Sequence, residues 1–208
     1  MHAVHDHLRA LTLADIGPCV AGKTLFELRP NLPKLRTITT LNLAETDTAS
    51  VAVFIVPPKL HLPFHDHPGM CVACKVLNGT LTVTGFDWKD PKTVKHGGPG
   101  EAIASFVGVN VESNSENSDL YMISENSGGV VHEMRNDLEH EPLVFCDVIT
   151  PPYSFEDDQR PCTYYKCREV PEGARASDVL RQGQEVLLSP IPQPHIPMHA
   201  IGLAEDLE

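Results

Sequence analysis

Basic residues are scarce in this 208-residue sequence, where 16 Lys and Arg face 28 Asp and Glu and the formal net charge is −12. A surface with this balance repels phosphate backbones, so we expect no nucleic-acid partner. There is no run of about 18 apolar residues, so we expect no membrane span. The first residues show neither a basic nor an apolar signal region. We therefore expect a cytoplasmic protein, with the nucleus as an additional compartment.

Cysteine is present but follows no secretory pattern. The sequence has six cysteines, and in a non-secreted chain of this length we expect free thiols rather than a disulfide framework. Cys71 and Cys74 form a CxxC motif. We expect both on one strand, where positions i and i+3 face opposite sides of the sheet. This geometry disfavours a zinc or dithiol site.

Long helices are not expected either, because 18 prolines and 14 glycines favour short strands joined by turns. Asn78-Gly79 predicts a type I′ hairpin turn between two strands. The hydrophobic pattern predicts helices near residues 8–16, 23–28 and 176–182 and a non-regular tail at 190–199. It predicts strands at residues 37–43, 50–56, 70–77, 80–88, 102–111, 120–124, 130–136, 143–150, 163–167 and 185–188. So many short strands in one domain indicate a sandwich or a barrel.

Two of the 11 histidines lie at the entry to a predicted strand. Side chains at i and i+2 of a strand point to the same face, about 6–7 Å apart, so His65 and His67 can bind one metal ion. His5 and His7 repeat the same His-Asp-His tripeptide, but they precede a helical segment. On a helix, i and i+2 do not face each other, so we expect no metal site there.

The spacing around this pair is similar to the first motif of double-stranded β-helix barrels, the cupin or jelly-roll fold. In that motif H-x-H is followed by a glutamate and, seven positions later, by a glycine. Gly79 fits the glycine position, whereas Val72 stands at the carboxylate position. A metal site here would therefore lack the acidic ligand that completes the facial triad of ordinary non-haem iron oxygenases.

A second cupin motif, in which a glycine is followed by a histidine and an asparagine, matches further along the chain. Gly129, His132 and Asn136 have its spacing, although Ser127 replaces its usual proline. The two motifs together predict a site of three histidines: His65, His67 and His132. Imidazole ligands suit Fe, Zn, Cu and Ni, and three neutral rings leave the ion's charge uncompensated and about half of its octahedron open.

Several motifs in order along the chain resemble the cysteamine dioxygenase and plant cysteine oxidase family of thiol dioxygenases. They are the stretches 63–70, 78–81, 86–88, 128–133, 147–153 and 162–165. The resemblance implies a cupin thiol dioxygenase in which His65, His67 and His132 hold Fe(2+). It implies that both atoms of O2 are added to the sulfur of cysteamine or of an N-terminal cysteine, giving a sulfinate. With protein substrates, this reaction would make them degradable when oxygen is plentiful.

The same resemblance implies roles for residues near the metal. Asp147 would orient the substrate amine or a neighbouring group, and Tyr153 would hydrogen-bond the bound ligands. From the residues alone, Asp147 could equally anchor the turn at Pro151-Pro152, and Tyr153 could be a core aromatic. Cys162 and Tyr164 stand where some family members form a thioether crosslink, but a buried cysteine beside a packed tyrosine explains these residues equally well.

The domain organisation expected from this comparison has three parts. Residues 1–35 form a helical lead-in packed on the barrel, residues 36–190 the cupin domain and residues 191–208 a tail, in a monomer. The loop 136–141 is longer and more acidic than is common in the family, which leaves its geometry and substrate access open. His61, His195 and His199 are expected to lie outside the metal site.

Two other functions remain compatible with a cupin barrel. One is an isomerase or hydrolase that uses Zn or Mn, and it predicts activity without O2. The other is a metal-free module for binding or sensing. The absence of a carboxylate at Val72 argues against the first, and the complete set of three histidines argues against the second.

Overall fold

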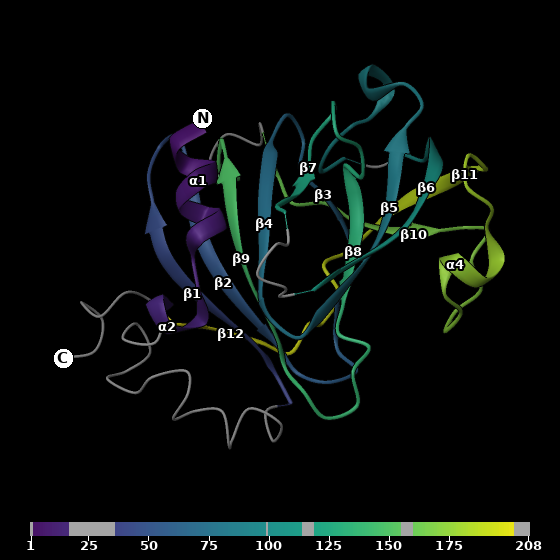
Figure 1. Ribbon diagram of the computed structural model, residues 1–208. Coiled ribbons are helices and arrows are strands. Elements are labelled where there is room, and N and C mark those ends of the chain that lie inside the picture. Colours follow the sequence, from purple (N-terminus) through teal and green to yellow (C-terminus); the bar gives the residue numbers. More distant parts are fainter. Residues whose placement is uncertain (1, 17–35, 99, 114–118, 155–159, 202–208) are drawn as a thin grey trace.

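The computed structural model describes residues 2–16, 36–98, 100–113, 119–154 and 160–201 (Figure 1). Two short helices precede the strands, and short helical turns lie later in the chain. The helical elements are α1 (His2–Ala10), α2 (Leu13–Ile16), η3 (Pro91–Thr93) and α4 (Ala176–Val179). The first six strands are β1 (Ile38–Glu45), β2 (Ser50–Val56), β3 (His61–Asp66), β4 (Cys71–Asn78), β5 (Thr80–Trp88) and β6 (Ala102–Ser113). The others are β7 (Tyr121–Ile123), β8 (Val131–Arg135), β9 (Leu143–Thr150), β10 (Tyr164–Cys167), β11 (Glu185–Ile191) and β12 (Met198–Ile201).

The strands form a six-stranded sheet of order β12-β1-β2-β9-β4-β7 and a closed barrel of order β10-β11-β6-β5-β8-β3. Most connections carry the chain from the sheet to the barrel or back. For example, β4 lies in the sheet between β3 and β5 of the barrel, and β9 lies in the sheet between β8 and β10 of the barrel. This alternation winds the chain as a double-stranded β-helix. The predicted all-β cupin fold with short N-terminal helices is confirmed.

Each sheet face has its own apolar cluster. Leu8 and Ile16 of the helices pack with Val53, Cys146 and Val148 on the outer face, where α1 lies across the sheet in Figure 1. The opposite face packs against the barrel. Its cluster includes Val56, Val72, Phe145 and Ile149 from the sheet and Leu62, Val83 and Met134 from the barrel. A third cluster, around Phe86, Val131 and Tyr165, packs among the barrel strands themselves.

Strand β9 shows how alternation positions a functional residue. Val144, Cys146 and Val148 belong to the cluster under the helices, whereas Phe145 and Ile149 belong to the inner cluster. Side chains alternate between the faces of a strand, so Asp147 falls in the inner row between two apolar residues. It is 5% exposed. The fold therefore buries a carboxyl group between the sheet and the barrel.

The predicted hairpin at Asn78-Gly79 is wrong. Strand β4 pairs with β7 and β9, whereas β5 pairs with β6 and β8, so the turn carries the chain from the sheet to the barrel. A type I′ turn requires positive φ at both central residues, but only Gly79 has it, at +80°. A Cβ at Gly79 would lie 2.9 Å from the carbonyl oxygen of Pro142. Gly79 therefore allows this turn to pack closely against the backbone at Pro142.

The prediction of a non-regular tail is also wrong in part. Strand β11 extends to Ile191, and β12 pairs in parallel with β1, with Met198 opposite Ile38. Helices α1 and α2 agree with the pattern at 8–16, while the helical patch at 23–28 lies outside the described residues. The division into lead-in, cupin domain and tail stays a prediction.

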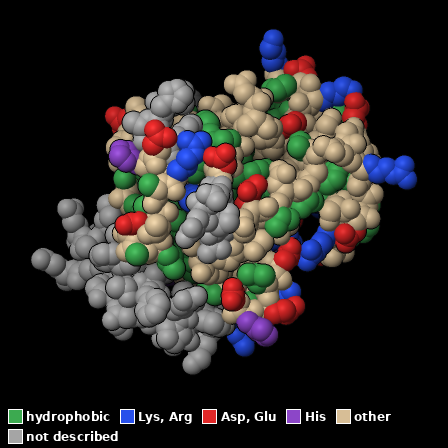
Figure 2. All heavy atoms as spheres, in the orientation of Figure 1, with side chains coloured by type: hydrophobic (Ala, Val, Ile, Leu, Met, Phe, Trp, Pro, Cys, Tyr) green, Lys and Arg blue, Asp and Glu red, His purple; other side chains and the backbone are tan. Residues whose placement is uncertain are grey.

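The sequence predictions on cysteines, membrane helices and surface charge concern the described residues as follows. Their five cysteines are free thiols, and Cys19 lies outside them. In the described part of the chain, no helix has the length and apolarity needed to cross a membrane. On the face shown in Figure 2, acidic and basic side chains are scattered and neither sign forms one continuous patch.

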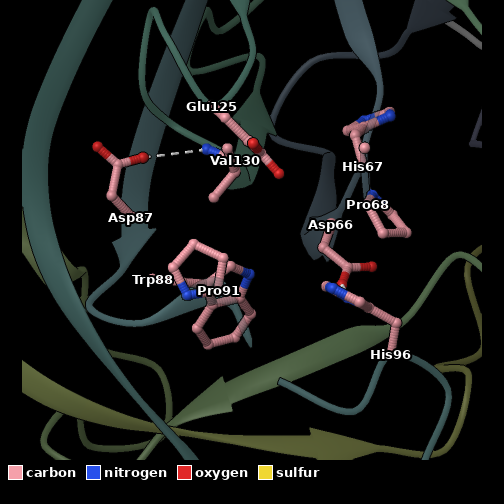
Figure 3. Close-up of a pocket in the computed structure, with 10 residues that line it drawn as sticks. Asp66, His67, Pro68, Asp87, Trp88, Pro91, His96, Glu125 and Val130 are labelled. Atoms are coloured by element: carbon pink, nitrogen blue, oxygen red, sulfur yellow. Dashed lines mark hydrogen bonds and ion pairs between the residues drawn. The ribbon is translucent and has the colours of Figure 1, made fainter. Parts of the chain in front are cut away.

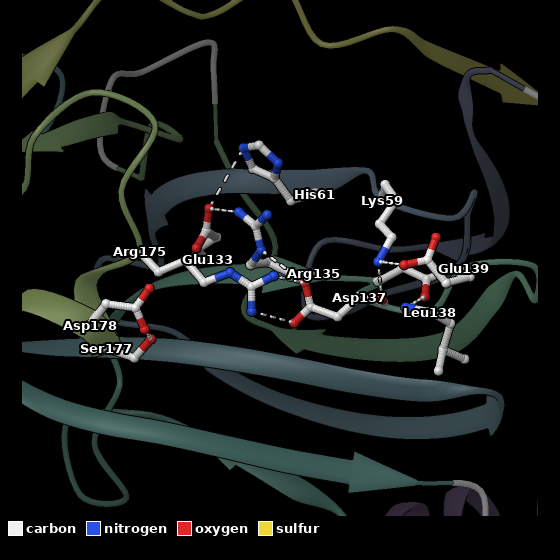
Figure 4. A network of polar contacts seen from close by, with 11 residues as sticks. Lys59, His61, Glu133, Arg135, Asp137, Leu138, Glu139, Arg175, Ser177 and Asp178 are labelled. Carbon is white, nitrogen blue, oxygen red and sulfur yellow. Dashed lines mark hydrogen bonds and ion pairs between the residues drawn. The ribbon is translucent and has the colours of Figure 1, made fainter.

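The acidic loop 136–141 is held by hydrogen bonds and ion pairs. The side-chain amide of Asn136 donates to the carbonyl oxygens of Val56 and Glu141, at 2.9 and 2.8 Å. Lys59 forms an ion pair with Glu139, and Arg175 contacts Asp137 (Figure 4). Both interactions are exposed and contribute little individually. The loop is thereby held against neighbouring segments.

Candidate metal centre

Adjacent barrel strands bring the three predicted histidines together. His65 on β3 and His132 on β8 are directly opposite in the antiparallel register, and His67 follows the end of β3. The ring centroids of His65 and His132 are 4.6 Å apart, and that of His67 lies 5.1 Å from the first and 5.0 Å from the second. One ring nitrogen from each residue lies within 4.8 Å of the others. The three side chains can therefore share one ion.

Backbone carbonyls orient two of the rings. The Nδ1 of His65 lies 2.8 Å from the carbonyl oxygen of Pro63, and the Nδ1 of His132 lies 3.0 Å from that of Gly129. A carbonyl can only accept, so each Nδ1 carries the proton and donates, leaving Nε2 with a free lone pair. The Nε2 of His132 is buried and has no hydrogen-bond partner among the described residues. An acceptor that is buried and unpartnered in this way fits a metal ligand.

Burial also sets the protonation state of the site. Desolvation lowers the pKa of His65 and, together with the charge of the neighbouring rings, holds the pKa of His67 and His132 well below the usual value. All three imidazoles are therefore neutral at physiological pH. Neutral imidazole is the form that binds a metal.

The carboxylate position of the first cupin motif contributes no ligand. Val72 is fully buried in the apolar cluster between sheet and barrel. Among the described residues, the group that could hold a metal consists of the three histidines alone. Its donors are all imidazole nitrogens, a set that suits Fe, Zn, Cu or Ni.

Asp66, between His65 and His67, anchors this segment and was not singled out from the sequence. Its carboxylate accepts hydrogen bonds from the backbone N–H of Thr163 at 2.9 Å and the Tyr165 hydroxyl at 2.9 Å. Its Oδ2 lies 2.6 Å from the Nδ1 of His96, and Figure 3 shows the two side chains side by side. Strand alternation predicts that Asp66 faces away from His65 and His67. The residues that it contacts there are distant in sequence, so no local pattern predicts them.

A cavity of about 310 Å³ lies beside the histidines. His65, His67, Asp147, Tyr153, Cys162 and Tyr164 line it, together with the apolar side chains of Phe54, Leu62, Met134 and Ile149 and with Gln193 and Met198. All four other predicted site residues thus share one cavity with two of the histidines. Among the described residues that line this cavity, none belongs to the loop 136–141.

Asp147 is the acidic group of the cavity. Its Oδ1 is buried and has no hydrogen-bond partner in the described part of the chain, while the thiol of its register partner Cys74 on β4 donates to the carboxylate. Burial raises the pKa of this carboxyl from 3.8 to about 7. A buried carboxylate without a compensating cation is costly, so the site is suited to a cationic ligand. The alternative of a turn anchor at Pro151-Pro152 has no support in these contacts.

Tyr153 links the cavity wall to the metal ligands. Its hydroxyl donates to the carbonyl oxygen of Asp66 at 2.8 Å and lies 2.9 Å from the Nδ1 of His67. Cys162 hydrogen-bonds to the hydroxyls of both Tyr153 and Tyr164, and burial raises the pKa of its thiol to about 11. The thiol is therefore protonated at neutral pH. A crosslink between Cys162 and Tyr164 stays a prediction.

The histidines that we expect outside the metal site lie elsewhere. His61 faces Glu133 at 3.6 Å in the polar network of Figure 4, and His195 and His199 are exposed. His7 is exposed on α1, and no metal-binding group found among the described residues includes it. A smaller hollow of about 130 Å³, lined by Asp87, Trp88 and His96 among others, lies on another side of His67 (Figure 3).

Comparison with known proteins gives a consistent result. The model of the PCO_ADO family matches residues 8–200. The chain is 35% identical over 130 residues to "Probable 2-aminoethanethiol dioxygenase" from Dictyostelium discoideum, covering 62% of this chain and 55% of that protein. It is 31% identical over 189 residues to "2-aminoethanethiol dioxygenase" from Homo sapiens, covering 82% and 66%. It is 29% identical over 132 residues to "Plant cysteine oxidase 1" from Arabidopsis thaliana, covering 62% and 41%. The chain therefore spans about half of the length of these relatives.

Proposed function

Because the chain belongs to the PCO_ADO family, we propose that it is a non-haem iron(II) thiol dioxygenase acting on an aminothiol. Its substrate is cysteamine or the N-terminal cysteine of a protein, groups that share a thiol and a primary amine two carbons apart. Both atoms of O2 are added to the sulfur, so the thiol becomes a sulfinic acid and no other reductant is needed. The names of the matched relatives support this class of substrate.

One observation carries the proposal: three neutral imidazoles without a carboxylate stand beside a cavity that contains a buried, unpartnered carboxyl oxygen. His65, His67 and His132 would hold iron and leave about half of its coordination positions free. Iron(II), when bound there, would supply the redox chemistry between thiol and O2. A site with no anionic protein ligand is suited to an anionic thiolate.

The other side chains orient the substrate. Asp147 accepts hydrogen bonds from the substrate ammonium, whose charge compensates the buried carboxylate. The ammonium in turn favours the ionised form of Asp147, opposing the effect of burial on its pKa. The Tyr153 hydroxyl supplies a hydrogen-bonding group next to His67. Phe54 and Met134 form apolar walls of the cavity beside the proposed position of the reacting sulfur.

An N-terminal cysteine substrate would place the protein in oxygen sensing, because the amount of sulfinate formed would follow the O2 concentration. We propose this role for a monomer in the cytoplasm, with the nucleus as an additional compartment. It predicts a rate that still rises with O2 across the physiological range.

The decisive experiment is anaerobic loading with iron(II), followed by O2 in the presence of cysteamine or of a peptide that begins with cysteine. Mass spectrometry should show the gain of two oxygen atoms on the thiol, and none with His132→Ala. Zinc or manganese in place of iron should give no product. If a metal-loaded protein transforms no thiol, or if activity persists without O2, the proposal is wrong.

A further inference from the structure

The cavity beside the histidines is larger than a small aminothiol requires. Its volume of about 310 Å³ corresponds to roughly ten water molecules at their liquid volume of about 30 Å³. A two-carbon thiol with an amine fills only part of this space. The remaining volume can therefore receive atoms that extend beyond the aminothiol group.

The opening of the cavity lies beside the C-terminal strap, which we define as residues 192–198. Among the described residues that line the cavity, Gln193 and Met198 alone are exposed, and both belong to this strap. The histidines, Asp147 and the apolar walls are buried or half-buried. A substrate whose sulfur reaches His65 and His67 therefore extends past Gln193 and Met198 toward solvent.

The strap is fixed at both ends. It follows β11, where Ile191 is the register partner of Tyr164, and it enters β12, where Met198 is the partner of Ile38 on β1. Figure 1 shows the yellow trace running from the barrel to the far edge of the sheet. The N–H of Ile38 donates to the carbonyl oxygen of Pro197 at 2.6 Å.

The interior of the strap is restrained as well. Prolines at 192, 194 and 197 fix φ at three of its positions. Ile196 packs against the apolar cluster between sheet and barrel. Gln193 and Met198 are therefore presented at defined positions at the rim of the cavity.

We propose that Gln193 and Met198 bind the residue that follows the N-terminal cysteine of a polypeptide substrate, and so determine specificity for peptides over small aminothiols. This inference rests on the proposed function. The Gln193 amide can donate to a backbone carbonyl and accept from a backbone N–H. Met198 offers a flexible, polarisable surface that adapts to different side chains. Such contacts tolerate variation at the second position and require a peptide bond after the cysteine.

The test compares Gln193→Ala and Met198→Ala with wild type, using cysteamine and a cysteine-initiated pentapeptide as substrates. A lost hydrogen bond or apolar contact of about 1 kcal/mol corresponds to about a fivefold change. Each variant should raise KM for the peptide about fivefold with little change in kcat, and leave kcat/KM for cysteamine within about twofold. Gln182→Ala, an exposed glutamine outside the cavity, is the matched control.

A second readout does not depend on turnover. Anaerobic calorimetry should show that the metal-free variants bind the peptide about fivefold more weakly than wild type. An equal loss for both substrates, or no loss for the peptide in either readout, would overturn the role of the strap while leaving thiol oxidation intact. Absence of product from both thiols with the wild-type protein would refute the proposed function and this inference with it.

Discussion

Replacing Asp147 with asparagine should stabilise the metal-free protein at alkaline pH while impairing its activity. The carboxyl pKa rises from 3.8 to about 7 on folding, because burial disfavours the charged form. A shift of about three units corresponds to about 4 kcal/mol at about 1.4 kcal/mol per unit. This value is the upper limit on the stabilisation gained by removing the charge. The measured gain should be smaller, because asparagine keeps a buried polar group.

The sign follows from proton binding. Between pH 3.8 and about 7 the native state holds a proton on Asp147 that the unfolded chain has released, so the free energy of unfolding falls as pH rises through this window. Above about pH 7 the free energy of unfolding carries the full penalty of the buried charge. Asp147→Asn should therefore be more stable than wild type by about 2 kcal/mol at pH 8. This advantage should be lost at pH 5, where the penalty of the charge is smaller by about 2.6 kcal/mol.

Urea unfolding of the metal-free proteins at both pH values measures this difference. Asp178→Asn, which removes an exposed carboxylate on α4, is the control and should show no such gain. In the iron-loaded protein, kcat/KM for cysteamine should fall about 10–100-fold. Activity toward 2-mercaptoethanol, which lacks the amine, should change little. Equal losses with both thiols, or a variant destabilised equally at pH 8 and pH 5, would refute the role assigned to this carboxylate.

Three further changes test other parts of the structure. His132→Ala should abolish stoichiometric iron binding and turnover, as measured by elemental analysis and sulfinate formation; a variant that keeps both would exclude His132 as a ligand. Asp66→Asn should lower the free energy of unfolding by about 2–3 kcal/mol and weaken metal binding about 10–100-fold, as measured by denaturation and metal titration, because the carboxylate is buried among its donors. Gly79→Ala should lower the urea midpoint by more than Gly173→Ala does. Both have φ near +80°, but only Gly79 also faces a backbone oxygen at 2.9 Å. Equal midpoints would contradict the close approach.

The spacing of the two cupin motifs was sufficient to predict which three histidines come together, because motifs on two strands fix which side chains share a face. The same reasoning failed at Asn78-Gly79, where the dipeptide favours a hairpin but the neighbouring strands pair elsewhere. Whether a tight turn joins paired strands or passes between sheets depends on long-range pairing, which local turn chemistry does not contain. The strand at Met198 was missed for a related reason, since the prolines around it suggest a coil and its pairing depends on β1.

The role of Asp66 could not be predicted because its partners come from segments about 30 and 100 residues away. Its position on the face opposite the histidines follows from alternation, but the donors that it meets there do not. Asp147 was placed by the family resemblance, and its unpartnered oxygen and raised pKa appear only once burial is known.

The barrel closes where β10 meets β3, and this seam has a single register pair, Tyr164 with His65. One partner of that pair is a predicted metal ligand. Asp66 adds a backbone hydrogen bond to Thr163, and its carboxylate accepts from Thr163 and Tyr165. His65 also faces His132 of β8, the strand on the other side of β3, so an ion held by both histidines would tie β3 to β8. The bound ion would therefore hold in place the strand at which the barrel closes, and its release would loosen β3.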